Sequence, residues 1–133
     1  MTVRKTINDL LAEARARLER LEPEQARAAS DAGALLVDIR SEAQRAADGT
    51  VPGSLFFPRN VLEWRLDPAP GHADPRVAGP EAEVILMCNE GYQSSLAAAT
   101  LQDLGFERST DVSGGFQAWR AAGLPVEPGD SAS

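Results

Sequence analysis

Residues 83–96 read EVILMCNEGYQSSL, and they join an apolar run to a short polar turn and then to a segment with helical spacing. The apolar run ends on Cys88, the only cysteine of the chain. A strand that enters a helix through a tight loop points several backbone N–H groups at one spot, and the helix N-terminus adds partial positive charge there. Such a spot favours the thiolate form of a cysteine, which is the nucleophilic form. We therefore predict an activated cysteine at the end of this strand.

A second interpretation of Cys88 stays open. A lone cysteine is more often a small buried apolar residue than a reactive one. Against this, open α/β sheets place their ligand sites outside the carboxyl ends of the strands, where Cys88 stands. The position of Cys88 favours a functional role without deciding the question by itself.

Length and composition set the broad class of protein. The chain has 133 residues, of which 43% are hydrophobic and 25% charged, as expected for one globular domain. Its net charge of −7 argues against nucleic acid or an anionic membrane as the main partner, because both need a basic surface. A single cysteine excludes an internal disulfide, and no segment approaches membrane-spanning length. We expect a cytoplasmic protein.

Strand-like and helix-like segments alternate along the chain. Apolar runs predict strands at residues 34–39, 55–57, 84–88 and 109–112. Helical spacing and capping residues predict helices at 24–30, 41–49, 94–104 and 116–122, with a brief helix at 59–66 and an irregular loop at 67–80. The alternation predicts an α/β fold, with a central, mostly parallel sheet of four to five strands covered by helices on both faces.

The first residues form a separate helical segment in this scheme. Apolar residues at helical spacing predict a helix over 6–21, and residues 1–20 are assigned to an N-terminal amphipathic helix. We expect it to cover one face of the sheet, and a helix that binds a partner is the alternative. The main domain is expected at 21–126 and a flexible tail at 127–133.

Four segments of this main domain, taken together, resemble the rhodanese-like sulfurtransferases. They are LVDIR at 36–40, GTVPGS at 49–54, CNEGYQS at 88–94 and SGGFQAW at 113–119, the last followed by AGLPV at 122–126. The segments occur in the family's order and extend over most of the domain. The resemblance implies the three-layer rhodanese-like fold and a single-domain sulfurtransferase.

The resemblance also implies a chemistry. Cys88 would take a sulfane sulfur from thiosulfate or a persulfide donor, and would pass it as a cysteine persulfide to cyanide, a small thiol or a protein acceptor. A covalent intermediate of this kind divides the transfer into two steps. The substrate would be bound by the loop residues Asn89, Glu90, Gly91, Tyr92, Gln93 and Ser94, whose amides stabilise the anionic sulfur. No cofactor is implied because sulfur itself carries the chemistry, and no residue cluster has metal-ligand spacing.

The loop departs from the family pattern at one important position. Many active members have an arginine where this chain has Gln93, and Glu90 adds negative charge nearby. The missing arginine removes a fixed charge that favours the thiolate and holds a dianion. We therefore predict a reactive cysteine with weaker thiosulfate binding. Arg59 and Arg65 are candidates to supply the charge from the segment after the second strand, and surface ion pairs are the alternative role for both.

Two other functions remain as alternatives. The domain could be a non-catalytic module in which Cys88 senses redox or persulfide state, or which binds a partner protein. It could also be a phosphatase of the related cysteine-loop type. That chemistry needs an arginine about six positions after the cysteine, and this chain has Ser94 there.

Overall fold

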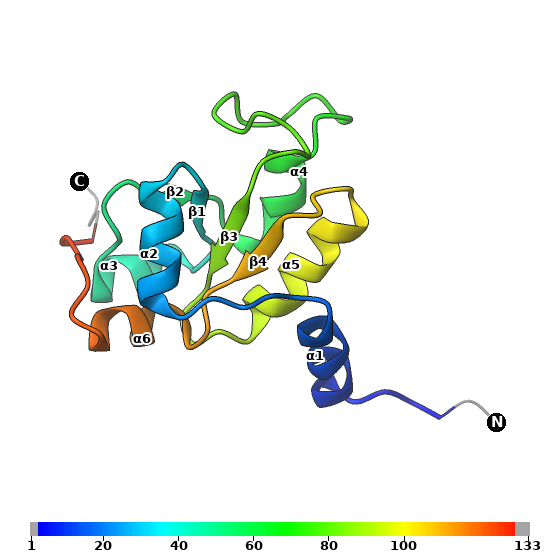
Figure 1. Ribbon diagram of the computed structural model, residues 1–133, viewed down its shortest axis with the longest axis horizontal. Helices are drawn as coiled ribbons and strands as arrows, with labels where there is room; N and C mark the ends of the chain where they lie inside the picture. The colour runs from blue at the N-terminus through cyan, green and yellow to red at the C-terminus, as the bar shows by residue number, and fades with distance from the viewer. Residues whose placement is uncertain (1–2, 130–133) are drawn as a thin grey trace.

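The computed structural model describes residues 3–129 and has an α/β fold built on a four-stranded parallel sheet (Figure 1). The strands are β1 (Leu35–Asp38), β2 (Leu55–Phe56), β3 (Val84–Met87) and β4 (Ser109–Asp111). They lie in the order β2-β1-β3-β4, and each neighbouring pair is parallel. The predicted parallel sheet is confirmed, with four strands.

Helices cover both faces of this sheet (Figure 1). They are α1 (Ile7–Ala16), α2 (Pro23–Asp31), α3 (Glu42–Asp48), α4 (Leu62–Leu66), α5 (Gln93–Asp103) and α6 (Gly115–Ala121), with a 3-10 turn at Arg59–Val61. Val84 and Leu86 of β3 belong to the core shared with α4 and α5, whereas Ile85 and Met87 belong to the core shared with α2 and α6. All four are fully buried, which explains the continuous apolar run in the sequence. In the part of the chain that the structure describes, no helix has both the length and the apolar character needed to cross a membrane.

The first helix is shorter than the sequence predicted. A helix was expected over 6–21, but α1 ends at Ala16 and the following residues run beside β4. The Leu21 amide donates to the Asp111 carbonyl at 3.0 Å, and the Ser113 amide donates to the Leu21 carbonyl at 2.8 Å. Strand β4 lies at the edge of the sheet, so its free backbone groups need partners. Pairing with this edge replaces the last turns of the predicted helix.

The position of α1 also differs from the expectation. It packs against α5, outside the layer that touches the sheet (Figure 1). Ala14 is buried in this contact, but Ile7 and Leu10 are 63% and 43% exposed. The apolar face of α1 is therefore only partly buried.

The carboxyl end of β1 holds a buried ion pair. Arg40 donates to both carboxylate oxygens of Asp38, at 3.0 and 2.8 Å, and both side chains are fully buried. Arg40 also donates to the Gly49 carbonyl at 2.7 Å and lies 3.8 Å from the ring centroid of Phe116. This ion pair therefore connects the end of β1 with the end of α3 and with α6.

The end of the described chain is tied to the domain. Glu127, the first residue of the predicted tail, exchanges two backbone hydrogen bonds with Thr50, at 2.9 and 2.8 Å. Residues 130–133 of that predicted tail lie outside the described residues.

Asp74 organises the irregular loop predicted at 67–80. Its carboxylate accepts hydrogen bonds from the Arg76 guanidinium at 2.9 and 2.8 Å, and from the Arg76 amide at 2.8 Å. Arg65 of α4 adds a longer contact at 3.4 Å. The hydrogen bonds from Arg76 hold the pKa of Asp74 well below its usual range. The Asp74 amide also donates to the Arg65 carbonyl at 2.9 Å, so both the backbone and the side chain of Asp74 attach the loop to α4.

Asp74→Asn should lower the urea midpoint at neutral pH, and this effect should shrink in acid. Because the pKa of Asp74 is lower in the folded than in the unfolded state, its stabilisation is complete above the unfolded value of about 4. It is lost as the pH falls through the folded value. Urea midpoints of the wild type and the variant should therefore differ at pH 7 and approach each other as the pH falls below about 4. A difference that is constant over this range would contradict the assignment.

Candidate active site

Cys88 follows β3 directly and begins the loop that leads into α5. Its side chain is only 2% exposed. The Gly91 amide donates to the Cys88 Sγ at 3.2 Å, so the loop turns back over the sulfur. This turn needs glycine, because Gly91 has a φ of +86° and a Cβ there would lie 2.7 Å from the Gly114 nitrogen. Of the backbone N–H groups that the sequence predicts around Cys88, the Gly91 amide bonds the sulfur.

The loop presents an open side and a buried side. Glu90, Tyr92 and Gln93 are exposed, whereas Gly91 and Ser94 are buried. Helix α5 begins at Gln93, and the N–H groups of a first helical turn have no partner within the helix. The Ser95 amide of this turn donates to the Tyr92 carbonyl at 3.2 Å, which leaves the amides of Gln93 and Ser94 as donors for an anionic group held at the loop.

The first turn of α6 holds the beginning of the cysteine loop. The Phe116 amide donates to the Cys88 carbonyl at 2.8 Å, and the Gln117 amide donates to the Asn89 carbonyl at 3.1 Å. The Gln117 side chain also donates to the Asn89 side-chain oxygen at 3.0 Å. Half-buried Asn89 is therefore fixed from both its backbone and its side chain.

A buried carboxylate lies behind the cysteine. Asp111, the last residue of β4, is fully buried and accepts hydrogen bonds from the hydroxyls of Ser94 and Ser95 at 2.7 and 2.8 Å. An ionised carboxylate only accepts, so the single hydroxyl proton of Ser94 is committed to Asp111. The Ser94 oxygen then accepts from the Cys88 thiol, with 3.3 Å between sulfur and oxygen. Sequence reasoning did not identify Asp111, although an acidic residue at the carboxyl end of the strand next to β3 was an available signal.

A family model for the rhodanese-like domain matches residues 22–122 of this chain. The chain belongs to the rhodanese-like domain family. A sulfurtransferase of Allochromatium vinosum is 34% identical over 92 residues, which cover 69% of this chain and 77% of that protein. The thiosulfate sulfurtransferase GlpE of Stutzerimonas stutzeri is 33% identical over 102 residues, which cover 77% of this chain and 84% of that protein.

One solved structure is similar over nearly the whole of this rhodanese-like domain and its first helix. It is a protein of unknown function from Rhodopseudomonas palustris, described as a possible tyrosine phosphatase. The TM-score is 0.85 at 35% identity, and the match covers 96% of this chain and 98% of that one. The shared fold extends to residues before the family match, since 96% coverage includes α1.

Arg59 and Arg65, predicted to bring charge to the rhodanese-like site, bind elsewhere. Arg59 donates to both carboxylate oxygens of Glu63 at 2.9 Å. Arg65 donates to the His72 carbonyl at 2.6 Å and to Asp74 at 3.4 Å. Within residues 3–129, the hydrogen bonds of both guanidiniums stay on their own segment of the chain. A role for either in binding substrate stays a prediction.

The cations that do bind the cysteine loop come from the N-terminal segment. Arg15 and Arg20 donate to the Gly91 carbonyl, at 2.8 and 2.9 Å. Arg20 also donates to the Asp111 carboxylate, at 2.9 and 3.2 Å. The sequence offered no signal for these contacts, because a helical pattern shows which residues are apolar and not which cation meets a distant loop.

Proposed function

We propose that this rhodanese-like domain is a sulfurtransferase that carries a sulfane sulfur on Cys88. The observation that supports the proposal is the placement of Cys88, with its Sγ 3.2 Å from the Gly91 amide and beside the first turn of α5. Backbone N–H groups so arranged stabilise a thiolate and a bound persulfide anion. The sulfurtransferase names of the relatives point to the same chemistry.

The proposed transfer has two displacement steps. The thiol first gives its proton to solvent, and the Cys88 thiolate attacks the outer sulfur of the donor. The new S–S bond forms as the donor's own bond to that sulfur breaks, and sulfite or a thiolate leaves with the electron pair. An acceptor nucleophile, which is cyanide, a small thiol or a protein thiol, then attacks the outer sulfur of the persulfide. This second step returns the Cys88 thiolate, so the cycle needs no cofactor.

A persulfide should be a better donor than thiosulfate. Gln93 and Glu90 are both exposed on the open side of the loop, and neither supplies a positive charge to a dianion. Arg59 and Arg65 are engaged with carboxylates. A monoanionic or neutral persulfide places a smaller demand on positive charge. We propose a cytoplasmic thiol persulfide as the donor class.

Intact mass measurement tests the function directly. The wild type should gain the mass of one sulfur after incubation with glutathione persulfide, and less completely with thiosulfate. Cys88→Ser, which changes one atom, should gain none. Cyanide should remove the added sulfur and release thiocyanate. If the wild type gains sulfur from neither donor, the result contradicts the enzyme proposal and favours a sensing or partner-binding module.

A phosphatase assay distinguishes the alternative raised by the solved relative. Ser94 stands where a cysteine-loop phosphatase needs its arginine, and the Asp111 carboxylate lies behind it at 2.7 Å. A phosphate dianion would meet a hydroxyl and a buried negative charge there. Hydrolysis of p-nitrophenyl phosphate that disappears in Cys88→Ser would contradict the sulfurtransferase proposal.

A further inference from the structure

Part of the proposed active site lies outside the family domain. The family match begins at residue 22, but Arg15 and Arg20 both donate to the Gly91 carbonyl within the cysteine loop. Arg15 also donates to the Ser95 hydroxyl at 3.2 Å. A carbonyl oxygen has two lone pairs, so the two guanidiniums together fill the acceptor capacity of Gly91.

The arrangement acts on the peptide unit between Gly91 and Tyr92. In a trans peptide the C=O and the N–H point in opposite directions. The Gly91 carbonyl points towards the two arginines, so the Tyr92 N–H points away from them. Hydrogen bonds to a carbonyl polarise the N–H of the same peptide unit, and this N–H becomes a stronger donor to an anion. The arginines therefore orient the loop and increase its attraction for negative charge.

Arg20 has a second effect through Asp111. Its guanidinium lies against the Asp111 carboxylate, which is separated from the Cys88 sulfur only by the Ser94 hydroxyl. A nearby negative charge disfavours a thiolate, and pairing with Arg20 offsets that charge. Among the described residues, the charged groups next to the cysteine loop are the guanidiniums of Arg15 and Arg20 and the carboxylate of Asp111. Glu90 adds a carboxylate on the exposed side of the loop.

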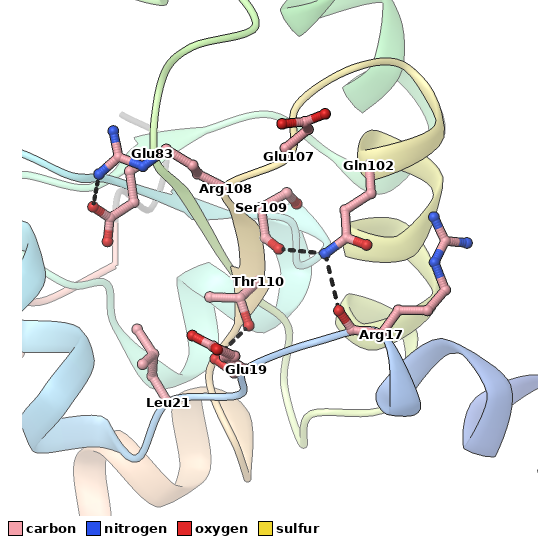
Figure 2. Close-up of a pocket in the computed structure, with 9 residues that line it drawn as sticks. All are labelled: Arg17, Glu19, Leu21, Glu83, Gln102, Glu107, Arg108, Ser109 and Thr110. Atoms are coloured by element: carbon pink, nitrogen blue, oxygen red, sulfur yellow. Dashed lines mark hydrogen bonds and ion pairs between the residues drawn. The ribbon is translucent and has the colours of Figure 1, made fainter.

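The segment that carries the two arginines is fixed in place (Figure 2). The side-chain amide of Gln102 in α5 donates to the carbonyls of Arg17 and Ser109 at 3.3 and 3.1 Å, and the Thr110 hydroxyl donates to the Glu19 carbonyl at 2.9 Å. Figure 2 shows these bonds along a pocket lined by residues at the amino ends of β3 and β4. Cys88 follows the other, carboxyl end of β3. The segment is thus held by α5 and β4, which also carry Ser94, Ser95 and Asp111.

We propose that Arg15 and Arg20 are positioning residues for Cys88: they orient the Gly91 peptide and supply, from the N-terminal segment, the positive charge that Gln93 does not provide. The inference rests on the proposed role of Cys88 as the sulfur carrier. It gives the helix before the family domain a function in the reaction.

The test is the pH profile of Cys88 alkylation by iodoacetamide, measured on the full chain. Arg15→Gln should move the profile to higher pH and slow alkylation at pH 7 by roughly threefold to tenfold, because a cation near the loop is lost. Arg17→Gln is the matched control. It removes the same charge two residues away, from a side chain that binds Asp103 at 2.7 Å and makes no bond to the loop. Arg15→Lys, which keeps the charge, should recover part of the loss.

The outcomes separate this inference from the proposed function. Alkylation needs no sulfur donor, so the profiles decide the role of Arg15 even if no persulfide forms. Identical profiles for Arg15→Gln and Arg17→Gln would overturn the inference, whatever the mass measurement gives. A shift confined to Arg15→Gln, with a urea midpoint close to that of Arg17→Gln, would support positioning over a general loss of structure.

Discussion

Replacing Asp111 by alanine should lower the free energy of unfolding by about 3–5 kcal/mol, because a mostly buried arginine loses its carboxylate. Asp111 is fully buried and is paired with Arg20, whose side chain is 20% exposed. The carboxylate also accepts the hydroxyl protons of Ser94 and Ser95. Removing it leaves one charge and two hydroxyls without their acceptor in the interior, and each such group carries a desolvation cost.

Urea denaturation measures this loss, and Asp103→Ala is its matched control. Asp103 also pairs with an arginine, Arg17 at 2.7 Å, but its side chain is 68% exposed. Exposed pairs contribute about 0–1 kcal/mol, so the control should be close to the wild type. Similar losses for the two variants would show that Asp111 is not the central acceptor of the site.

Gly115→Ala should destabilise the protein by about 2–6 kcal/mol, the sum of backbone strain and overpacking. Gly115 has a φ of +62°, a left-handed conformation that costs other residues about 1–3 kcal/mol. An added Cβ would also collide with the Cys88 carbonyl oxygen and lie 2.8 Å from the Asn89 carbonyl carbon. Relief of that collision must move the backbone at Cys88, so sulfur loading should fall together with stability.

Gly123→Ala separates the two contributions. Gly123 follows the other end of α6 and has a φ of +76°, but a Cβ there would meet no heavy atom within 4 Å. This variant should lose only the stability that backbone strain costs, about 1–3 kcal/mol of the free energy of unfolding. Sulfur loading of Cys88 should stay normal. Equal losses in the two variants, measured by urea denaturation, would contradict the close approach of α6 to the cysteine loop.

The sheet could be predicted because its strands have a simple physical signature. Residues of β3 face two cores, so every position is apolar and the run in the sequence is unbroken. Ser41 with Gln44 predicted the start of α3 through local capping bonds, which the structure contains at 3.1 and 3.2 Å. The end of α1 was predicted wrongly, because helical spacing continues through residues that the edge of β4 holds in an extended form.

The sequence by itself determined the sheet, the position of Cys88 at the end of β3 and the glycine turn that returns the loop to the sulfur. These depend on apolar periodicity and on local backbone conformation, which neighbouring residues control. Only the tertiary structure decided which charges meet the loop. Arg15 and Arg20 reach Gly91 across more than 70 positions of sequence, and Arg20 reaches Asp111 across 91. A long flexible cation can bind any acceptor within reach. Packing of α1 on α5 places Arg15, and pairing of the next residues with the edge of β4 places Arg20.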